Sequence, residues 1–139
     1  MADLQARLED FPTCTTDKLR YRDCDAQGHV NNAVYSTFLE SARTEMLYVG
    51  GEPILDPGCG FVIVRLELDF VAETHWPGTV DIGSRILKLG TSSVTMKQTI
   101  FQNGKVVADA VCVLVQVNMD SRKPQAISDR ARARLEPLS

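Results

Sequence analysis

The longest regular pattern in the chain is an apolar stripe with helical spacing. Between residues 31 and 49, apolar side chains recur at steps of three and four, and polar side chains fill much of the other face. This spacing predicts an amphipathic helix. Asn31 or Asn32 can cap its first turn, and Gly50-Gly51 can end it, because glycine adopts the left-handed conformation at little cost. The stripe consists of Val34, Tyr35, Phe38, Leu39, Ala42, Met46 and Val49.

After this helix, the pattern changes to the two-residue alternation typical of β-strands. Strands are predicted over residues 61–72, 79–88, 93–102 and 105–118. Asn103-Gly104 predicts a tight type I′ hairpin between the last two, because both central positions of that turn need a positive φ. In the first of these strands, one face is predicted to carry Val62, Val64, Leu66, Leu68 and Phe70.

The two ends of the chain are less regular. Residues 1–16 show no period and are interpreted as a loosely attached lead-in, followed by a short strand over residues 19–22. Ser128 can cap a short helix that ends near Leu135. Because tight connections imply antiparallel neighbours, we predict a single α+β domain. One curved five-stranded antiparallel sheet would wrap around one long central helix.

Composition excludes several classes of function. The 139 residues carry a net charge of −3, which argues against a broad nucleic-acid-binding surface. No apolar run approaches the roughly 20 residues that a membrane span needs, and no export signal is visible. The four cysteines form no C-x-x-C pair, and the two histidines are far apart, so no metal site is expected. We therefore expect a cytoplasmic protein with reduced thiols.

The segment that leads into the helix resembles a known family. The tract from Tyr21 to Tyr35, which contains Asp25, Gly28 and His29, and the tract from Glu40 to Leu47 resemble the hotdog-fold acyl-CoA thioesterases. The closest resemblance within that group is to the 4-hydroxybenzoyl-CoA thioesterase-like branch. The similarity continues through residues 62–65, 90–93 and 122–124, and it covers about residues 18–130.

The resemblance implies how the site and the assembly are built. The family's catalytic carboxylate matches Asp25 and does not match Asp23. The His29-Val30-Asn31-Asn32 stretch is closer to acyl-CoA and acyl-carrier-protein relatives than to the aromatic enzyme. The family also implies a homodimer or homotetramer with active sites between subunits. The predicted strands 61–72 and 105–118 would leave long edges able to pair with a second copy.

Thioester hydrolysis needs an attacking group and donors for the oxyanion that develops on the carbonyl. Asp25, in a loop before a helix, can act as general base or nucleophile, and the N–H groups of Val30, Asn31 and Asn32 can hold the oxyanion. The structural alternative is that Asp25 only turns the loop.

The neighbouring polar residues each have two interpretations as well. His29 can orient the thioester or the attacking water, or it can tie the loop to a backbone carbonyl. Asn32 can position water or cap the helix, and Gln27 can hydrogen-bond the thioester.

Coenzyme A carries phosphates, so basic residues at a cleft rim are candidate ligands. The candidates are Arg65, Lys88, Arg122, Lys123 and the turn at Thr91-Ser92, although each can equally be an ordinary surface feature. Coenzyme A is part of the substrate, so no separate cofactor is expected. The sequence predicts an acyl-CoA thioesterase. The alternative is a non-catalytic acyl-thioester-binding module, or a dimeric scaffold, on the same fold.

Overall fold

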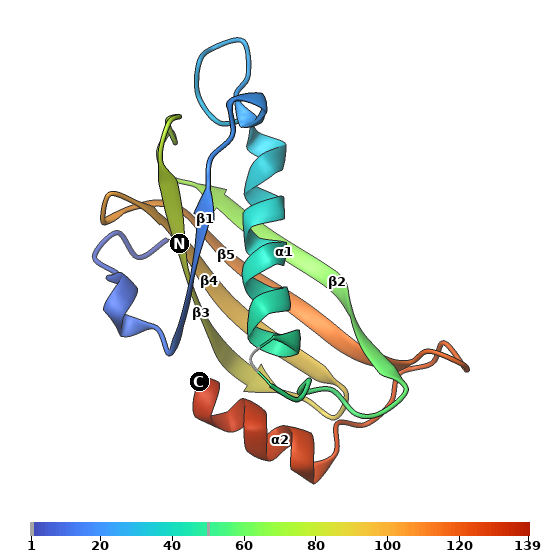
Figure 1. Cartoon of the computed structure of the whole chain (residues 1–139). Helices are drawn as coiled ribbons and strands as arrows, with labels where there is room; N and C mark the ends of the chain where they lie inside the picture. The colour runs from blue at the N-terminus through green and yellow to red at the C-terminus, as the bar shows by residue number, and fades with distance from the viewer. Residues whose placement is uncertain (1, 50) are drawn as a thin grey trace.

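A computed structural model describes residues 2–49 and 51–139, and it contains one five-stranded antiparallel sheet with helices (Figure 1). The strand order across the sheet is β1-β3-β4-β5-β2. Short 3-10 helices span Leu8–Asp10, Tyr21–Asp23 and Glu136–Leu138. The main elements are β1 (Thr13–Lys18), α1 (Asn32–Tyr48), β2 (Cys59–Phe70), β3 (Thr79–Leu89), β4 (Ser93–Gln102), β5 (Lys105–Asn118) and α2 (Asp129–Leu135).

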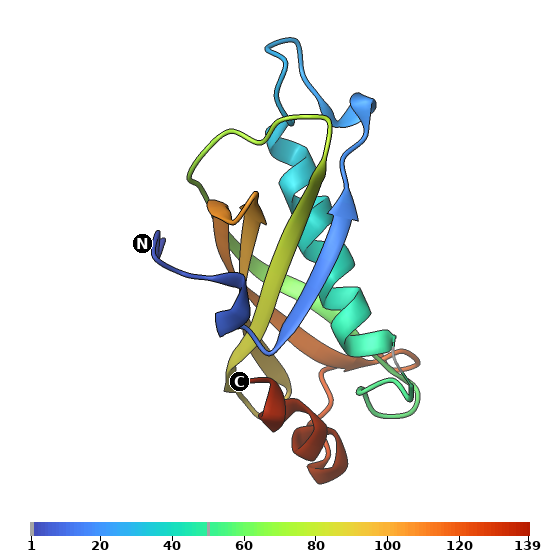
Figure 2. The same ribbon diagram turned by 60° about the vertical axis from the view of Figure 1, so that its left-hand side comes forward.

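Helix α1 lies across one face of the sheet (Figures 1 and 2). The predicted cap is confirmed for Asn31, whose side-chain oxygen accepts the Ala33 N–H at 2.9 Å. The helix ends at Tyr48, and Gly50 of the predicted stop lies outside the described residues. The buried stripe packs against the inner face of the sheet, and each fully buried apolar side chain contributes about 1.5–3 kcal/mol. This core includes Phe38, Leu39, Ala42, Val80, Ile82 and Ile100.

Most of the predicted elements after α1 are confirmed within two residues. Asn103 and Gly104 have φ values of 53° and 78°, as a type I′ hairpin requires. Ser128 caps α2, because its hydroxyl accepts the Ala131 N–H at 3.1 Å.

The N-terminal prediction is wrong in two respects. Residues 19–22 form no strand, because β1 has already ended at Lys18 and a 3-10 helix begins at Tyr21; Leu19, between them, is buried in the core. The first strand is instead β1, which pairs with β3 from Thr13 to Lys18. It begins inside the segment 1–16 interpreted as a loosely attached lead-in and ends two residues after it. The sequence of β1 is threonine-rich and lacks an apolar alternation, so periodicity could not reveal it.

A bulge divides β2 into two halves with opposite phase. The pairing with β5 shifts between Ile63 and Arg65, so the predicted single face of five apolar residues is wrong. Val62 pairs with Val115 on the outer face, whereas Ile63 pairs with Leu114 on the face that carries α1. The alternation in the sequence cannot reveal this because a bulge inserts one unpaired residue.

Strand β2 lies at the edge of the sheet, whereas β5 is paired on both sides. The expectation of a free edge is therefore correct for β2 and wrong for β5. Val62 and Val64 on β2 are 41% and 59% exposed. An apolar, unpaired edge of this length is a surface that natural proteins rarely leave bare.

The buried carboxylate of Asp56 ties the start of β2 to β5 and α2. It accepts hydrogen bonds from Gln116 Nε2 and from the Ser128 N–H, both at 2.9 Å, and from the Ser128 hydroxyl. Burial alone would raise the pKa of Asp56, but the hydrogen bonds from Ser128 and Gln116 outweigh it and hold the pKa below its ordinary value.

We expect Asp56→Asn to lower the free energy of unfolding at pH 7 by about 1.5–3 kcal/mol, because asparagine offers one uncharged acceptor oxygen where the donors of Ser128 and Gln116 now use both carboxylate oxygens. A carboxyl whose pKa is lower when folded stabilises the protein above its unfolded pKa, near 3.9, and this contribution is lost as the pH falls through the folded pKa. In urea unfolding experiments, the difference in the free energy of unfolding between wild type and variant should therefore become smaller below about pH 4. An equal gap at pH 7 and at acid pH would contradict this assignment.

Candidate active site

A tight turn between the 3-10 helix at residues 21–23 and α1 holds Asp25 and His29 side by side. The Asp25 N–H donates to the His29 carbonyl at 2.9 Å, and the Gly28 N–H donates to the Asp25 carbonyl at 3.1 Å. Gly28 has a φ of 86°, a conformation that glycine adopts without strain. The turn therefore fixes both side chains immediately before the first turn of α1.

The two carboxylate oxygens of Asp25 have different partners. Oδ1 accepts the Gln27 N–H at 2.9 Å. This hydrogen bond stabilises the turn, as expected if Asp25 has a structural role. Oδ2 lies 3.6 Å from His29 Nδ1, and the Asp25 side chain is 26% exposed. One oxygen thus shapes the turn while the other faces an imidazole and remains accessible to a ligand.

The side chain of Asp23 has a different environment from that of Asp25. It is 6% exposed, and its Oδ2 accepts the Arg20 N–H at 2.8 Å. Its carbonyl accepts the Asn31 N–H at 2.8 Å, so the residue locks the loop to the helix start. This environment gives Asp23 a structural role and leaves Asp25 as the accessible carboxylate of the pair.

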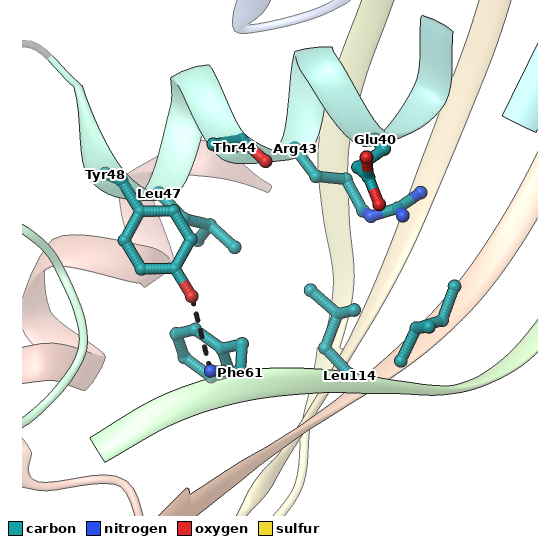
Figure 3. Close-up of a pocket in the computed structure, with 8 residues that line it drawn as sticks. Glu40, Arg43, Thr44, Leu47, Tyr48, Phe61 and Leu114 are labelled. Carbon is teal, nitrogen blue, oxygen red and sulfur yellow. Dashed lines mark hydrogen bonds between the residues drawn. The ribbon is translucent and has the colours of Figure 1, made fainter. Parts of the chain in front are cut away.

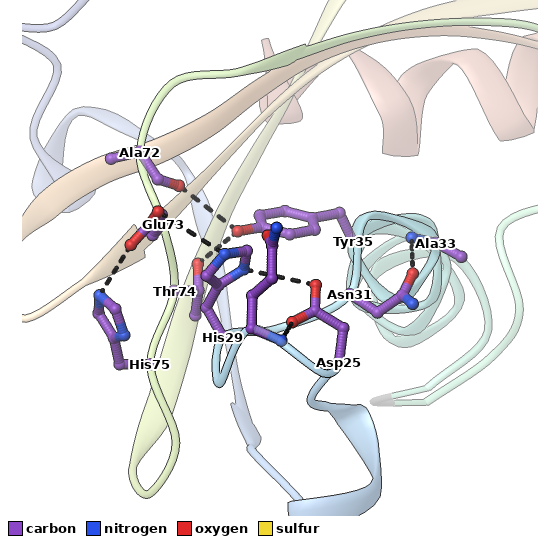
Figure 4. Close-up of polar contacts among 10 residues, drawn as sticks. Asp25, His29, Asn31, Ala33, Tyr35, Ala72, Glu73, Thr74 and His75 are labelled. Atoms are coloured by element: carbon purple, nitrogen blue, oxygen red, sulfur yellow. Dashed lines mark hydrogen bonds and ion pairs between the residues drawn. The ribbon is translucent and has the colours of Figure 1, made fainter.

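His29 lies between two carboxylates (Figure 4). Its Nε2 is 3.6 Å from Glu73 Oε1, and Glu73 Oε2 is 3.6 Å from His75 Nε2. Glu73 and His75 belong to the connection between β2 and β3, which carries no recognisable motif. Only the fold brings Glu73 to the imidazole, so the sequence offered no signal for it.

Two of the three predicted oxyanion donors are already used. The Val30 N–H donates to the Thr74 carbonyl at 2.9 Å, and the Asn31 N–H donates to Asp23. The prediction is therefore wrong for the Val30 and Asn31 amides. Within the described part of the chain, the Asn32 N–H has no hydrogen-bond partner, and it lies at the positive end of the α1 dipole.

A cavity of about 250 Å³ opens beside this helix start. His29, Asn32 and Glu73 line its polar side, and Tyr35 and Phe70 line its apolar side. The Tyr35 hydroxyl shares a hydrogen bond of 2.8 Å with the Thr74 hydroxyl, which fixes the ring. The cavity combines an apolar wall with the Glu73 carboxylate, the His29 imidazole and the Asn32 backbone donor. Asp25 does not line this cavity; it lines a neighbouring hollow with Gly28 and Trp76, and His29 lies between the Asp25 and Glu73 carboxylates. Gln27 is exposed at the tip of the turn.

The candidate phosphate ligands lie elsewhere in the same chain. Thr91 and Ser92 form the turn between β3 and β4, and their carbonyls accept from Ile127 and Gln116. Arg122 and Lys123 follow β5, and this end of the sheet is opposite to the Asp25 loop (Figure 1).

Arg65 lies on β2 and forms an exposed ion pair with Glu67. Lys88 is exposed on β3, beside the bulge in that strand. One chain therefore does not bring the basic tract at 122–123 to Asp25.

Other expectations concern cysteines, metals and membranes. All four cysteines are free thiols. Across residues 2–49 and 51–139, no group of three or more His, Cys, Asp or Glu side chains could hold a metal ion. In the same described residues, no helix is both long and apolar enough to span a membrane.

Comparison with known proteins identifies the family. Residues 19–135 match the thioesterase-like superfamily. The chain is 29% identical over 128 residues to the long-chain acyl-CoA thioesterase FadM of Escherichia coli, covering 89% of this chain and 97% of FadM. It is 27% identical over 114 residues to the acyl-CoA thioester hydrolase YbgC of Escherichia coli, covering 79% of this chain and 85% of YbgC.

A solved structure agrees with these relatives. A thioesterase from Thermus thermophilus, crystallised with coenzyme A and Zn, superposes with a TM-score of 0.81 at 30% identity, covering 94% of this chain and 96% of that one. The match to the family spans most of the chain, including the Asp25 loop, α1 and strands β2 to β5. The chain therefore belongs to the thioesterase-like superfamily.

Proposed function

We propose that the protein is an acyl-CoA thioesterase that hydrolyses a thioester to a carboxylic acid and free coenzyme A. The observation that carries this proposal is the accessible Asp25 carboxylate, held against His29 at the start of α1 in a member of the thioesterase-like superfamily. The names of FadM and YbgC support acyl-CoA as the substrate class.

In the proposed reaction, Asp25 either takes a proton from an attacking water or attacks the thioester carbonyl itself. His29 orients the water or the carbonyl, and Glu73 fixes the imidazole from the other side. The developing oxyanion is stabilised by the Asn32 N–H and the α1 dipole. Collapse of the tetrahedral intermediate breaks the C–S bond, and the thiolate takes up a proton and leaves as coenzyme A. If Asp25 attacks directly, the product of this step is an acyl-Asp25 anhydride, which water then hydrolyses to the carboxylic acid and free Asp25.

We also propose that two copies of the chain complete the site. Strand β2 runs from the end of the sheet near Arg122 to the end near Asp25. Antiparallel pairing of two β2 edges across a two-fold axis would bring the Arg122 end of one copy beside the Asp25 end of the other. The two sheets would then wrap around both α1 helices, as in a hotdog dimer, and pairs of dimers could form a tetramer.

The basic tract gives a first test of this arrangement. We expect Arg122→Ala combined with Lys123→Ala to raise KM for acyl-CoA several-fold with little change in kcat, because a rim phosphate contact gains about 0.5–1 kcal/mol per cation. An acyl-pantetheine, which lacks the nucleotide, should not respond. Steady-state kinetics on both substrates check this, and equal effects on the two would show that the tract acts through the fold.

The experiment that tests the function itself is a panel of acyl-CoAs from short to long chains, assayed with a chromogenic thiol reagent. We expect thiol release that depends on the enzyme and on chain length. Binding of acyl-CoA without thiol release would instead identify a non-catalytic binding module.

A further inference from the structure

A second cavity, of about 200 Å³, lies between the C-terminal half of α1 and the start of β2 (Figure 3). Its apolar wall is formed by Leu47, Phe61, Ile63 and Leu114, and Glu40, Thr44 and Tyr48 contribute polar groups. Arg43, from α1, also lines it and is 8% exposed. A guanidinium is an unusual group in such a wall, because a buried charge is costly unless it is paired.

The Arg43 side chain is held in place, but few groups around it compensate for the burial of its charge. One of its N–H groups donates to Gln98 Oε1 at 3.3 Å. Gln98 is itself held by the Leu39 carbonyl and the Ser84 hydroxyl, both at 3.1 Å. A guanidinium has five N–H donors, so this contact leaves most of them for a ligand.

No negative charge in the described chain neutralises Arg43. No carboxylate among the described residues forms an ion pair with it, and Glu40, which lines the same cavity, is exposed to solvent. Cys112 lies close by, and burial raises the pKa of its thiol although its interaction with the Arg43 guanidinium acts in the opposite direction. Within the described residues, Arg43 is therefore a fixed, buried cation with no ion pair within 4 Å, and Glu40 is the acidic residue that lines its cavity.

The Arg43 cavity and the Asp25 site lie along the same two elements. The cavity at the helix start is lined by Asn32 of α1 and Phe70 of β2, and the second is lined by Arg43 and Ile63 of the same elements. Eleven residues separate Asn32 from Arg43, which is about 16 Å along the helix axis. An extended acyl chain that starts at the cavity beside Asn32 and runs along α1 would have to span about this length to reach Arg43.

We propose that Arg43 binds a carboxylate at the far end of the acyl chain, so that the favoured substrate is the coenzyme A monothioester of a long dicarboxylic acid. This inference rests on the proposed thioesterase function. A carboxylate matches the planar fork of a guanidinium in two parallel hydrogen bonds, and it would give Arg43 the direct ion pair that it does not have among the described residues. Arg43 is thus a specificity-determining residue, remote from the reacting atoms.

The test compares kcat/KM for dodecanedioyl-CoA and dodecanoyl-CoA, which differ only in the terminal carboxylate. We expect wild type to favour the dicarboxylic substrate by about tenfold or more, as one charge-assisted hydrogen-bonded contact can supply. Arg43→Gln should remove the preference, and Arg43→Lys should keep part of it. The matched control is Glu40→Gln, because Glu40 lies on the same helix and lines the same cavity as Arg43. This variant should keep or increase the preference, since it removes a negative charge that repels the terminal carboxylate of the substrate.

Each outcome separates this inference from the proposed function. Release of thiol from neither substrate, nor from any acyl-CoA of the panel, would overturn the thioesterase proposal. Hydrolysis of both with no preference in wild type would overturn the role of Arg43 alone, as would an Arg43→Gln variant that keeps the preference. If Arg43→Gln fails to fold, inhibition of wild type by the free acids decides the question, since dodecanedioic acid should inhibit more strongly than dodecanoic acid.

Discussion

Replacing Asp25 with asparagine is expected to lower kcat/KM for an acyl-CoA by a factor of about 10²–10⁴, the usual contribution of a general base. Asparagine keeps the shape of the side chain, and its oxygen can still accept the Gln27 N–H that shapes the turn. It cannot take a proton from water or attack a carbonyl. The fold should therefore survive while turnover is lost, which steady-state kinetics and a thermal unfolding curve check together.

Asp23→Asn is the matched control, two residues away in the same loop. An asparagine there can still accept the Arg20 N–H, so its effect on kcat/KM should be much milder. If Asp25→Asn keeps more than about a tenth of wild-type kcat/KM, the loss is below about 1.4 kcal/mol and Asp25 is not the catalyst.

The second large effect is expected from the edge of the sheet. Val62→Lys combined with Val64→Lys places charges on the exposed β2 edge, where two copies would bring like charges together. The variant should have the 15.4 kDa mass of one chain, whereas wild type should have at least twice that mass. Because the site would lose its second half, we expect kcat/KM to fall by at least about 10²-fold. Light scattering and kinetics measure the two effects.

Leu87→Lys controls for the introduction of lysine. Leu87 is 50% exposed and, like Val64, sits at a bulge, but it lies on β3 and not on the β2 edge where the two copies are proposed to pair. This variant should keep both the mass and the activity of wild type. A fully active wild-type protein with the mass of one chain would contradict the proposed assembly.

The elements that the sequence predicted well are those whose periodicity matches their burial. In β4, Val94, Met96, Gln98 and Ile100 alternate along the strand and are all buried, so the pattern and the structure agree. Strand β1 gave no such signal, because an edge strand of threonines pairs mainly through its backbone. The bulge in β2 was equally hidden, since Val64 continues an apolar run while the register shifts beneath it.

The residues of the candidate site also fall into those that the sequence could predict and those that it could not. Asp25 and His29 lie in one short loop, so the sequence alone could place them together. The amides of Val30 and Asn31 could not be judged from the sequence, because their acceptors are set by tertiary contacts with Thr74 and Asp23. Glu73 and Arg43 were missed because each reaches its cavity only after α1 and β2 come together.

The most direct test of the central claim identifies the products that purified wild-type protein forms from dodecanoyl-CoA, separated by chromatography and identified by mass. The proposed function predicts free coenzyme A and dodecanoic acid in equal amounts, formed at a rate proportional to enzyme concentration. Dodecanoyl-CoA that remains bound but intact, from the first turnover onwards, would contradict it.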